Sequence, residues 1–195
     1  PAILNEYFLN PLVKAYDITI PSIARSGIHN FFANIGTVSD IGNDLLQANF
    51  KYAGHDLIRL FLNTTLGLFG LVDVASDAGF YPHPQGFGLT MAKWGVVDSP
   101  YLVLPFLGPS TARDTFSLVP NYFMSADTYV NHNSNYYLAT GVQYVQLASD
   151  MLPKQNTLIE TALDPYIAVR SAYLQYRAYA IRQVRNETMP TRTKD

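Results

Sequence analysis

The chain has 195 residues, enough for one buried core, and we expect a single helical domain over residues 1–185 followed by a polar tail over 186–195. Hydrophobic residues make up 48% of the chain and charged residues only 14%, whereas soluble domains carry roughly 25% charged residues. The net charge of −2 provides no positive field for a phosphate backbone, so we expect no nucleic-acid partner. Within this sequence, the absence of cysteine excludes disulfides and thiolate metal sites.

The sequence contains no stretch typical of a membrane-spanning helix, which needs about 20 mostly apolar residues. The most apolar charge-free run, Leu60 to Val72, has 13 residues, and the longer run from Thr128 to Ser149 is rich in Asn, Gln and Ser. The sequence does not open with a basic region followed by an apolar core, so we expect that any secretion signal has been removed or was never present. The composition therefore favours either a protein that lies against lipid without spanning it or a soluble domain with a Tyr-rich core.

Hydrophobic periodicity predicts helices along most of the chain. The first covers about 22–36, with Ser22 placed to cap it and Gly36 placed to end it. Two more are expected at about 38–50 and 51–62. On the last of these a narrow polar stripe recurs every four residues at Lys51, His55, Arg59 and Asn63. A helix that is apolar over most of its circumference is either buried in a large core or lies in lipid.

Residues 64–110 are rich in glycine and proline, so helices there must be short. The strongly apolar segment from Pro100 to Pro109 contains three prolines, which favours a buried or lipid-dipping hairpin, with a short β-strand as an open alternative. A final helix is predicted from Asp164 to Val184, with Asp164 as its cap and Pro165 in its first turn. Its tyrosines and alanines are predicted to pack on one side, opposite a face formed by Arg170, Leu174, Arg177, Ile181 and Arg185.

The sequence offers little for catalysis. Its four histidines fall in separate segments without the HExxH spacing, so we expect no metal site and no cofactor. Ser110 lacks the Gly-x-Ser-x-Gly frame of a hydrolase and is interpreted as a helix cap. Asp73 and Asp77 are four residues apart, a spacing common on solvated helix faces. We therefore expect no enzyme activity and assign no catalytic residue.

Several blocks follow one another in the order found in one protein family. Phe61-Leu-Asn-Thr-Thr-Leu-Gly67 and Gly70-Leu-Val-Asp-Val-Ala75 resemble that family's FxNTxxGxxGxxDVA block. Its FGxTLGxWGVGxGPYLVLPxxGPSxxRD signature is matched by Phe87-Gly-Leu-Thr90, Trp94-Gly-Val96, Pro100-Tyr-Leu-Val-Leu-Pro105, Gly108-Pro-Ser110 and Arg113-Asp114. With residues 30–34, 43–47 and 164–166, the similarity covers roughly residues 10–180. On these residues the chain resembles the MlaA/VacJ family.

The chain departs from the family pattern at two places. The family's GVGxGPY is here Gly95-Val-Val-Asp-Ser-Pro-Tyr101, so Val97 and Ser99 replace two glycines and a hinge would depend mainly on Gly95. The N-terminal DPLExFNR box is not intact, and Asn5 to Phe8 is either its remnant or a trimmed start. Members of this family are bacterial outer-membrane lipoproteins, which implies an acylated cysteine upstream of Pro1.

The resemblance implies a mainly α-helical fold, a ring or disc of short amphipathic helices lying in the membrane plane, with a Gly/Pro-rich apolar hairpin and a central polar channel. It implies that mislocalised phospholipid passes from the outer leaflet to a periplasmic lipid carrier, in the outer membrane and facing the periplasm, with a trimeric porin as a frequent neighbour. Our candidates for the lipid path or a hinge are Trp94, Gly95, Tyr101, Leu104, Asn63, Arg113 and Asp114. Helix-end hydrogen bonds would explain the three polar residues equally well.

Two other functions remain open on the sequence alone. One is a soluble periplasmic lipid-binding module with a closed apolar cavity, which the composition permits. The other is a lipid-cleaving enzyme, which would need an ordered nucleophile and base.

Overall fold

The computed structural model describes residues 7, 9–104, 108–129 and 134–186. Its helices are α2 (Asn10–Thr19), α3 (Ser22–Leu46), α4 (Phe50–Thr65), α5 (Val74–Asp77), α6 (Phe87–Lys93), α7 (Ala112–Met124), the 3-10 helix η2 (Ala126–Tyr129), α8 (Ser134–Thr161) and α9 (Pro165–Asn186). Its strands are β1 (Tyr101–Leu104) and β2 (Gly108–Thr111). The predicted mainly α-helical fold class is therefore confirmed.

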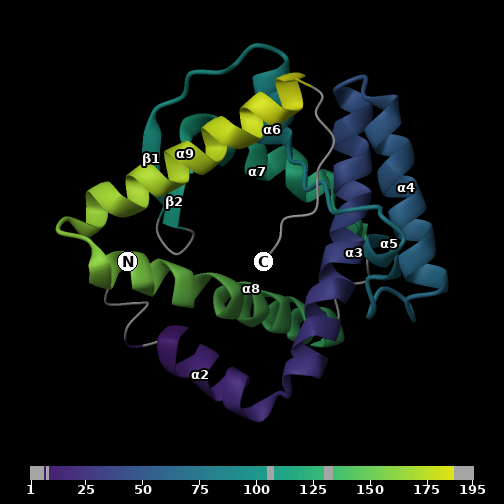
Figure 1. Cartoon of the computed structure of the whole chain (residues 1–195), viewed down its shortest axis with the longest axis horizontal. Coiled ribbons are helices and arrows are strands. Elements are labelled where there is room, and N and C mark those ends of the chain that lie inside the picture. The colour runs from purple at the N-terminus through teal and green to yellow at the C-terminus, as the bar shows by residue number, and fades with distance from the viewer. Residues whose placement is uncertain (1–6, 8, 105–107, 130–133, 187–195) are drawn as a thin grey trace.

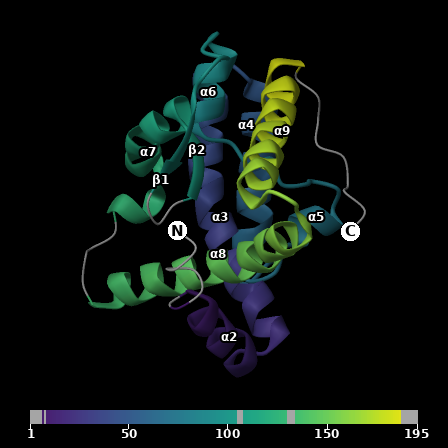
Figure 2. The ribbon, with the colours of Figure 1, turned by 90° about the vertical axis from the view of Figure 1, so that its left-hand side faces the viewer.

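The helices form a ring (Figure 1). Helix α3 contacts α8, α8 contacts α9, α9 contacts α6, and α6 returns to α3. Helix α4 packs along α3, α2 packs on α8, and α7 packs on α6. In the view turned by 90°, α8 lies below α6 and α9 (Figure 2). The ring brings α9, near the end of the described chain, against α6 from its first half.

Helix α3 corrects the predicted break at Gly36. The structure has one 25-residue helix over Ser22–Leu46 where two helices were expected, and Gly36 lies inside it. A glycine lowers helix stability by about 1 kcal/mol but does not end a helix whose neighbours continue it. The chain leaves the helix near Ala48, which adopts a φ of +56°. The predicted cap is also wrong, because Pro21 holds the cap position and no side chain caps the helix.

Helix α4 carries its polar stripe on the inside. Asp56, Arg59 and Asn63 are 1%, 6% and 5% exposed, whereas Leu57 and Phe61 are 57% and 64% exposed. The predicted stripe is confirmed only in part, because Arg59 and Asn63 are buried whereas Lys51 is exposed and His55 is half-buried, and the buried Asp56 was not predicted. Periodicity alone does not say which face meets solvent. The structure shows a helix that turns its polar side toward the protein.

The same inversion extends through the fold. Among the residues that the structure describes, 14 polar or charged side chains are buried but only nine hydrophobic ones, and 39 large hydrophobic side chains are exposed. The buried apolar cluster is small and consists of Leu89, Ala92, Ile181 and Val184 at the contact of α6 with α9. Soluble proteins bury mainly apolar residues, and their buried polar residues are the exception. Within the described ranges, no helix has both the length and the apolar character to cross a membrane.

The predicted hairpin is present and consists of two antiparallel strands. Tyr101 pairs with Thr111, and Leu104 pairs with Gly108. Pro109 lies opposite Val103 in β2, which a proline tolerates because each strand of a two-stranded sheet has a free edge. The alternative of a short β-strand is thus the observed one. Residues 105–107, which join the strands, lie outside the described residues.

Helix α9 begins as the sequence predicts, because the Ile167 backbone N–H donates to Asp164 Oδ1 at 3.1 Å. It ends at Asn186, inside the predicted tail, and residues 187–195 lie outside the description. The predicted division of its faces is partly wrong. Tyr176 and Tyr179 are 61% and 58% exposed, whereas Ile181 from the opposite face is buried.

Candidate functional site

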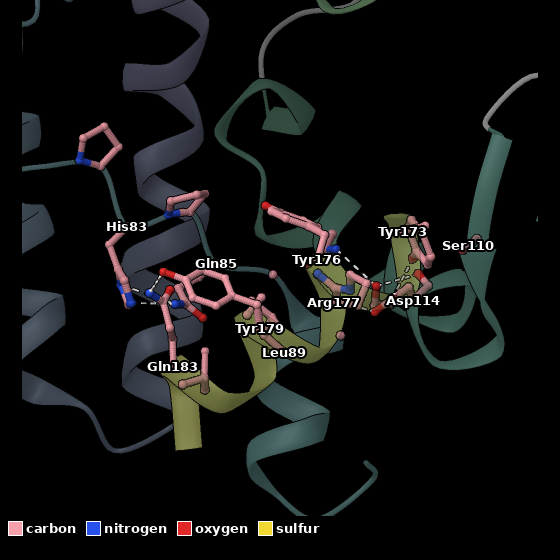
Figure 3. Close-up of a pocket in the computed structure, with 18 of the residues that line it drawn as sticks. His83, Gln85, Leu89, Ser110, Asp114, Tyr173, Tyr176, Arg177, Tyr179 and Gln183 are labelled. Atoms are coloured by element: carbon pink, nitrogen blue, oxygen red, sulfur yellow. Dashed lines mark hydrogen bonds and ion pairs between the residues drawn. The ribbon is translucent and has the colours of Figure 1, made fainter. Parts of the chain in front are cut away.

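A cavity of about 980 Å³ lies between α9 and the segment that leads into α6 (Figure 3). Its remaining walls come from α7 and the hairpin, with further contributions from Ser76 in α5 and from Gly88 and Leu89 in α6. The polar side chains that line it include His83, Gln85, Ser110, Asp114, Ser117, Asn121, Tyr173, Arg177 and Gln183. The volume is at the upper end of the range for small-molecule sites, which is about 300–1,000 Å³.

Asp114 is the centre of one wall (Figure 3). Its Oδ1 accepts from Arg177 Nη2 at 2.5 Å, and its Oδ2 accepts from the Tyr173 hydroxyl at 2.8 Å. Thr111 caps α7 by accepting from the Asp114 backbone N–H at 3.2 Å. Burial alone would raise the pKa of Asp114, but Arg177, Tyr173 and Arg113 together hold it below its ordinary value. The carboxylate is therefore ionised and fixed between two helices.

Arg177 separates this cavity from a second one of about 570 Å³ and lines both. The second cavity is also lined by Arg113, Arg182 and Arg185. Within the described chain, the Nε of Arg177 is buried and has no hydrogen-bond partner. Most buried N–H groups are paired, so this unpaired donor is an exception.

The opposite wall carries His83 and Gln85, supported by a buried polar network (Figure 3). Gln47 Nε2 donates to Gln85 Oε1 and to Thr90 Oγ1, both at 3.0 Å. The Gln85 backbone N–H donates to Asp40 Oδ1 at 2.6 Å. Burial raises the pKa of Asp40 to about 8 despite that hydrogen bond. Polar groups thus extend from the cavity wall into the interior of the ring.

Two of the seven residues predicted for the lipid path, Leu104 and Asp114, line the large cavity. Tyr101 lies behind that wall, with its ring 6.0 Å from the Tyr173 ring and Arg170 stacked over it at 5.7 Å. Arg113 lines the second cavity and donates to the carbonyls of Val96 and Val97 at 3.2 and 3.1 Å.

The other three predicted residues lie elsewhere. Asn63 joins α4 to α5, since its Nδ2 donates to Asp73 at 2.9 Å and its Oδ1 accepts from the Ala75 backbone N–H at 2.9 Å. Trp94 is 56% exposed at the end of α6 and donates from Nε1 to the Leu46 carbonyl at 3.2 Å. Gly95 follows it with a φ of +110° and open space where a side chain would stand.

Sequence reasoning did not select Tyr173 and Arg177, which complete the Asp114 wall. They are four residues apart, and residues at this spacing share one face of a helix. The sequence placed them on opposite faces of α9 because the tyrosines were grouped with the alanines. A helix whose polar face points inward gives no local signal of that orientation.

In the described part of the chain, Ser110 lines the cavity without a base as hydrogen-bond partner. Ser110 Oγ donates to the Thr111 carbonyl at 3.3 Å and lies 3.1 Å from Thr115 Oγ1, and neither partner is a base. The predicted capping role of Ser110 is wrong, because Thr111 caps α7.

Comparisons with known proteins agree with this architecture. The MlaA lipoprotein family model matches residues 2–180. The chain is 33% identical to an uncharacterized protein of Rickettsia typhi, over 97% of this chain and 76% of the relative. It is 31% identical to the intermembrane phospholipid transport system lipoprotein MlaA of Escherichia coli strain K12, over 89% of this chain and 69% of that relative.

One solved structure, described as the structural basis for maintenance of bacterial outer membrane lipid asymmetry, is similar with a TM-score of 0.77 and 30% identity. The match covers 92% of this chain and 90% of that one. A family model that spans most of the chain, together with a solved structure that shares its fold, decides the assignment: the chain belongs to the MlaA lipoprotein family.

Proposed function

We propose that this chain is a phospholipid transport component of the bacterial outer membrane, which lets mislocalised phospholipid leave the outer leaflet along a polar path. The observation that carries the proposal is the inverted fold, in which apolar side chains are exposed and polar ones are buried, together with a cavity that presents the Arg177–Asp114 pair beside apolar walls. The names of the relatives support the same function, since the Escherichia coli protein is an intermembrane phospholipid transport lipoprotein.

The physical basis is the cost of moving a polar headgroup through hydrocarbon. An unpaired polar group in an apolar medium costs about 2–7 kcal/mol, and an unpaired charge costs more. A cavity that presents Arg177, Tyr173 and Gln85 lowers this cost by offering hydrogen bonds, while the acyl chains remain in apolar surroundings. Arg177 lines both cavities, and a guanidinium is suited to the oxygens of a phosphate group.

The orientation of the ring follows from the same surface. Side chains such as Leu57, Phe61, Phe116 and Phe123 are 57–64% exposed, and lipid would cover them at no cost. We propose that the helices lie in the plane of the membrane, facing the periplasm, and that residues 1–185 act as one domain with 186–195 as a tail. The proposal also includes two partners, a trimeric porin as neighbour and a periplasmic lipid carrier as acceptor. It includes transport without covalent chemistry.

The test uses two neighbouring residues of α7. Leu118 is 46% exposed and lines the cavity, whereas Val119 is 61% exposed and does not. In a strain that lacks its own copy of the protein, Leu118→Trp should fail to restore a low outer-leaflet phospholipid content, because the indole fills the path. Val119→Trp should restore it like the wild type. Full restoration by both variants would contradict the proposal.

A second experiment separates this function from the soluble lipid-binding module. The purified chain should float with liposomes and need detergent to stay monodisperse, because so much apolar surface is exposed. A chain that stays monodisperse in buffer and remains with the aqueous fraction would favour the soluble module instead.

A further inference from the structure

Three ionisable side chains from distant segments meet behind the His83 wall of the cavity. Asp44 comes from α3, Asp56 from α4 and His83 from the segment before α6. One possible ligand atom from each lies within 4.8 Å of the others. Asp44 is 0% exposed, Asp56 is 1% exposed, and the His83 side chain is 9% exposed. The cluster is therefore closed off from bulk solvent.

The carboxylates of this cluster lack the partners that burial requires. Within the described residues, neither oxygen of Asp44 accepts a hydrogen bond, and neither does Oδ2 of Asp56. The remaining contacts are His83 Nδ1 at 3.9 Å from Asp44 Oδ1, and His55 Nδ1 at 3.0 Å from Asp56 Oδ1. A buried carboxylate is paired, hydrogen-bonded, bound to a metal or neutralised by a proton, because an isolated charge is too costly to bury. The unpartnered oxygens of Asp44 and Asp56, gathered with His83, therefore leave a place that a cation can take instead of a proton.

We propose that Asp44, Asp56 and His83 bind a divalent transition-metal ion of the zinc class. Two carboxylates and one imidazole form a mixed oxygen and nitrogen ligand set that suits Zn²⁺, whereas Ca²⁺ and Mg²⁺ take oxygen ligands alone. A second oxygen of Asp44 or a water molecule supplies the fourth position of a tetrahedral site.

The geometry needs only small adjustments to close around an ion. For three atoms no more than 4.8 Å apart, a central point lies at most about 2.8 Å from each, and zinc requires about 2.0–2.2 Å. A shift of each side chain by well under 1 Å closes the site. His83 is already held in place, because its ring stacks on Tyr52 with centroids 4.4 Å apart.

The surroundings of His83 supply both an entry route and support for a bound ion. His83 and Gln85 line the large cavity, so an ion reaches the cluster from there. The Gln85 amide lies 2.9 Å from His83 Nε2. With Nδ1 on the metal, Nε2 carries the proton, and the Gln85 amide accepts it once the amides of Gln85 and Gln47 both turn, so that Gln47 Oε1 accepts from Gln85 Nε2.

The test is a titration of the full chain in detergent with ZnCl₂ after EDTA treatment and desalting. We expect one equivalent of Zn²⁺ to bind by isothermal calorimetry and the thermal midpoint to rise, because a ligand that binds only the folded state stabilises it. Asp44→Asn and His83→Gln should each weaken zinc binding by at least about 10-fold. The matched controls Asp77→Asn and His29→Gln change exposed residues outside the cluster and should bind zinc like the wild type.

The EDTA-treated proteins separate a metal site from a purely structural role. Without metal, Asp44→Asn should melt no lower than the wild type, because the substitution removes an unpaired buried charge. The proposal is overturned if the wild type takes up no zinc, or if Asp44→Asn and His83→Gln gain as much stability from zinc as the wild type does. It does not depend on the transport function, since zinc binding is measured without lipid transfer.

Discussion

Arg177 on α9 and Asp114 on α7 form an ion pair that joins residues 63 positions apart, with Nη2 2.5 Å from Oδ1. The close approach depends on Gly88 in α6, because a Cβ at that position would lie 2.2 Å from Asp114 Oδ1. Three helices therefore meet at one carboxylate, and a single ion pair fixes the cavity wall to the ring. The Asp114–Arg177 pair therefore both shapes the cavity and stabilises the ring.

Removal of the Asp114 charge should destabilise the fold. Asp114→Asn leaves the guanidinium of Arg177, with a side chain 18% exposed, without its counter-ion. Breaking a buried ion pair costs about 3 kcal/mol, and we expect a lower thermal midpoint in detergent by circular dichroism. Asp77→Asn, on an exposed residue of α5, is the control and should melt like the wild type. Equal midpoints for all three proteins would show that the pair contributes nothing.

The same carboxylate predicts a dependence of stability on acid pH. The folded pKa of Asp114 lies below its ordinary value of 3.8, because Arg177, Tyr173 and Arg113 outweigh the effect of burial. Its stabilising contribution is therefore fully present above the unfolded pKa and is lost as the pH falls through the folded pKa. Between pH 7 and pH 3 the midpoint of the wild type should fall more steeply than that of Asp114→Asn. Parallel pH profiles would contradict this assignment.

The inverted polarity of α4 can be tested with two residues two positions apart. Asn63→Leu removes hydrogen bonds to Asp73 and from the Ala75 backbone, so we expect a loss of about 2–4 kcal/mol in detergent. Phe61→Asn, at a site 64% exposed, should keep the wild-type midpoint but bind liposomes less. An ordinary soluble helix would give the reverse order, in which Phe61→Asn is destabilising and Asn63→Leu is tolerated. Melting and flotation assays on the two variants decide between them.

Local signals predicted those parts of the fold that local interactions determine. Asp164 caps α9, the proline-interrupted segment forms a hairpin, and Arg59 and Asn63 of the predicted α4 stripe share a buried face, because each depends on residues close in sequence. Which face of a helix points inward depends on the surrounding medium, which no periodicity encodes. The contacts of Asp114 with Arg177 and of Asp44 with His83 join distant segments, so spacing along the chain did not indicate either.

Gly95 should be required for its backbone conformation rather than for space. Its φ of +110° is strained for any L side chain, whereas a Cβ there would meet nothing within 4 Å. Gly95→Ala should therefore lower stability by at least about 1–2 kcal/mol. Gly141→Ala is the matched control, because a Cβ at Gly141 also meets nothing within 4 Å. Gly141 lies within α8, where alanine stabilises the helix by about 0.5–1 kcal/mol relative to glycine. Opposite signs of the two midpoint shifts are expected, and equal signs would contradict the backbone argument.

Trp94, the only tryptophan in the chain, reports directly on whether the outer surface of the ring meets lipid. It is 56% exposed, beside Val96 at 45% and Leu46 at 46%, and indole rings favour the membrane interface. On addition of liposomes its emission should move to shorter wavelength and acrylamide should quench it less.

In a Trp94→Phe background, a tryptophan placed by Phe61→Trp on the outside of α4 should respond in the same way. One placed by Tyr179→Trp, which lines the cavity, should respond less, because that position faces the cavity and not the lipid. An equal response from the inner and outer probes, or none from Trp94, would rule out an apolar exterior in lipid around a polar path.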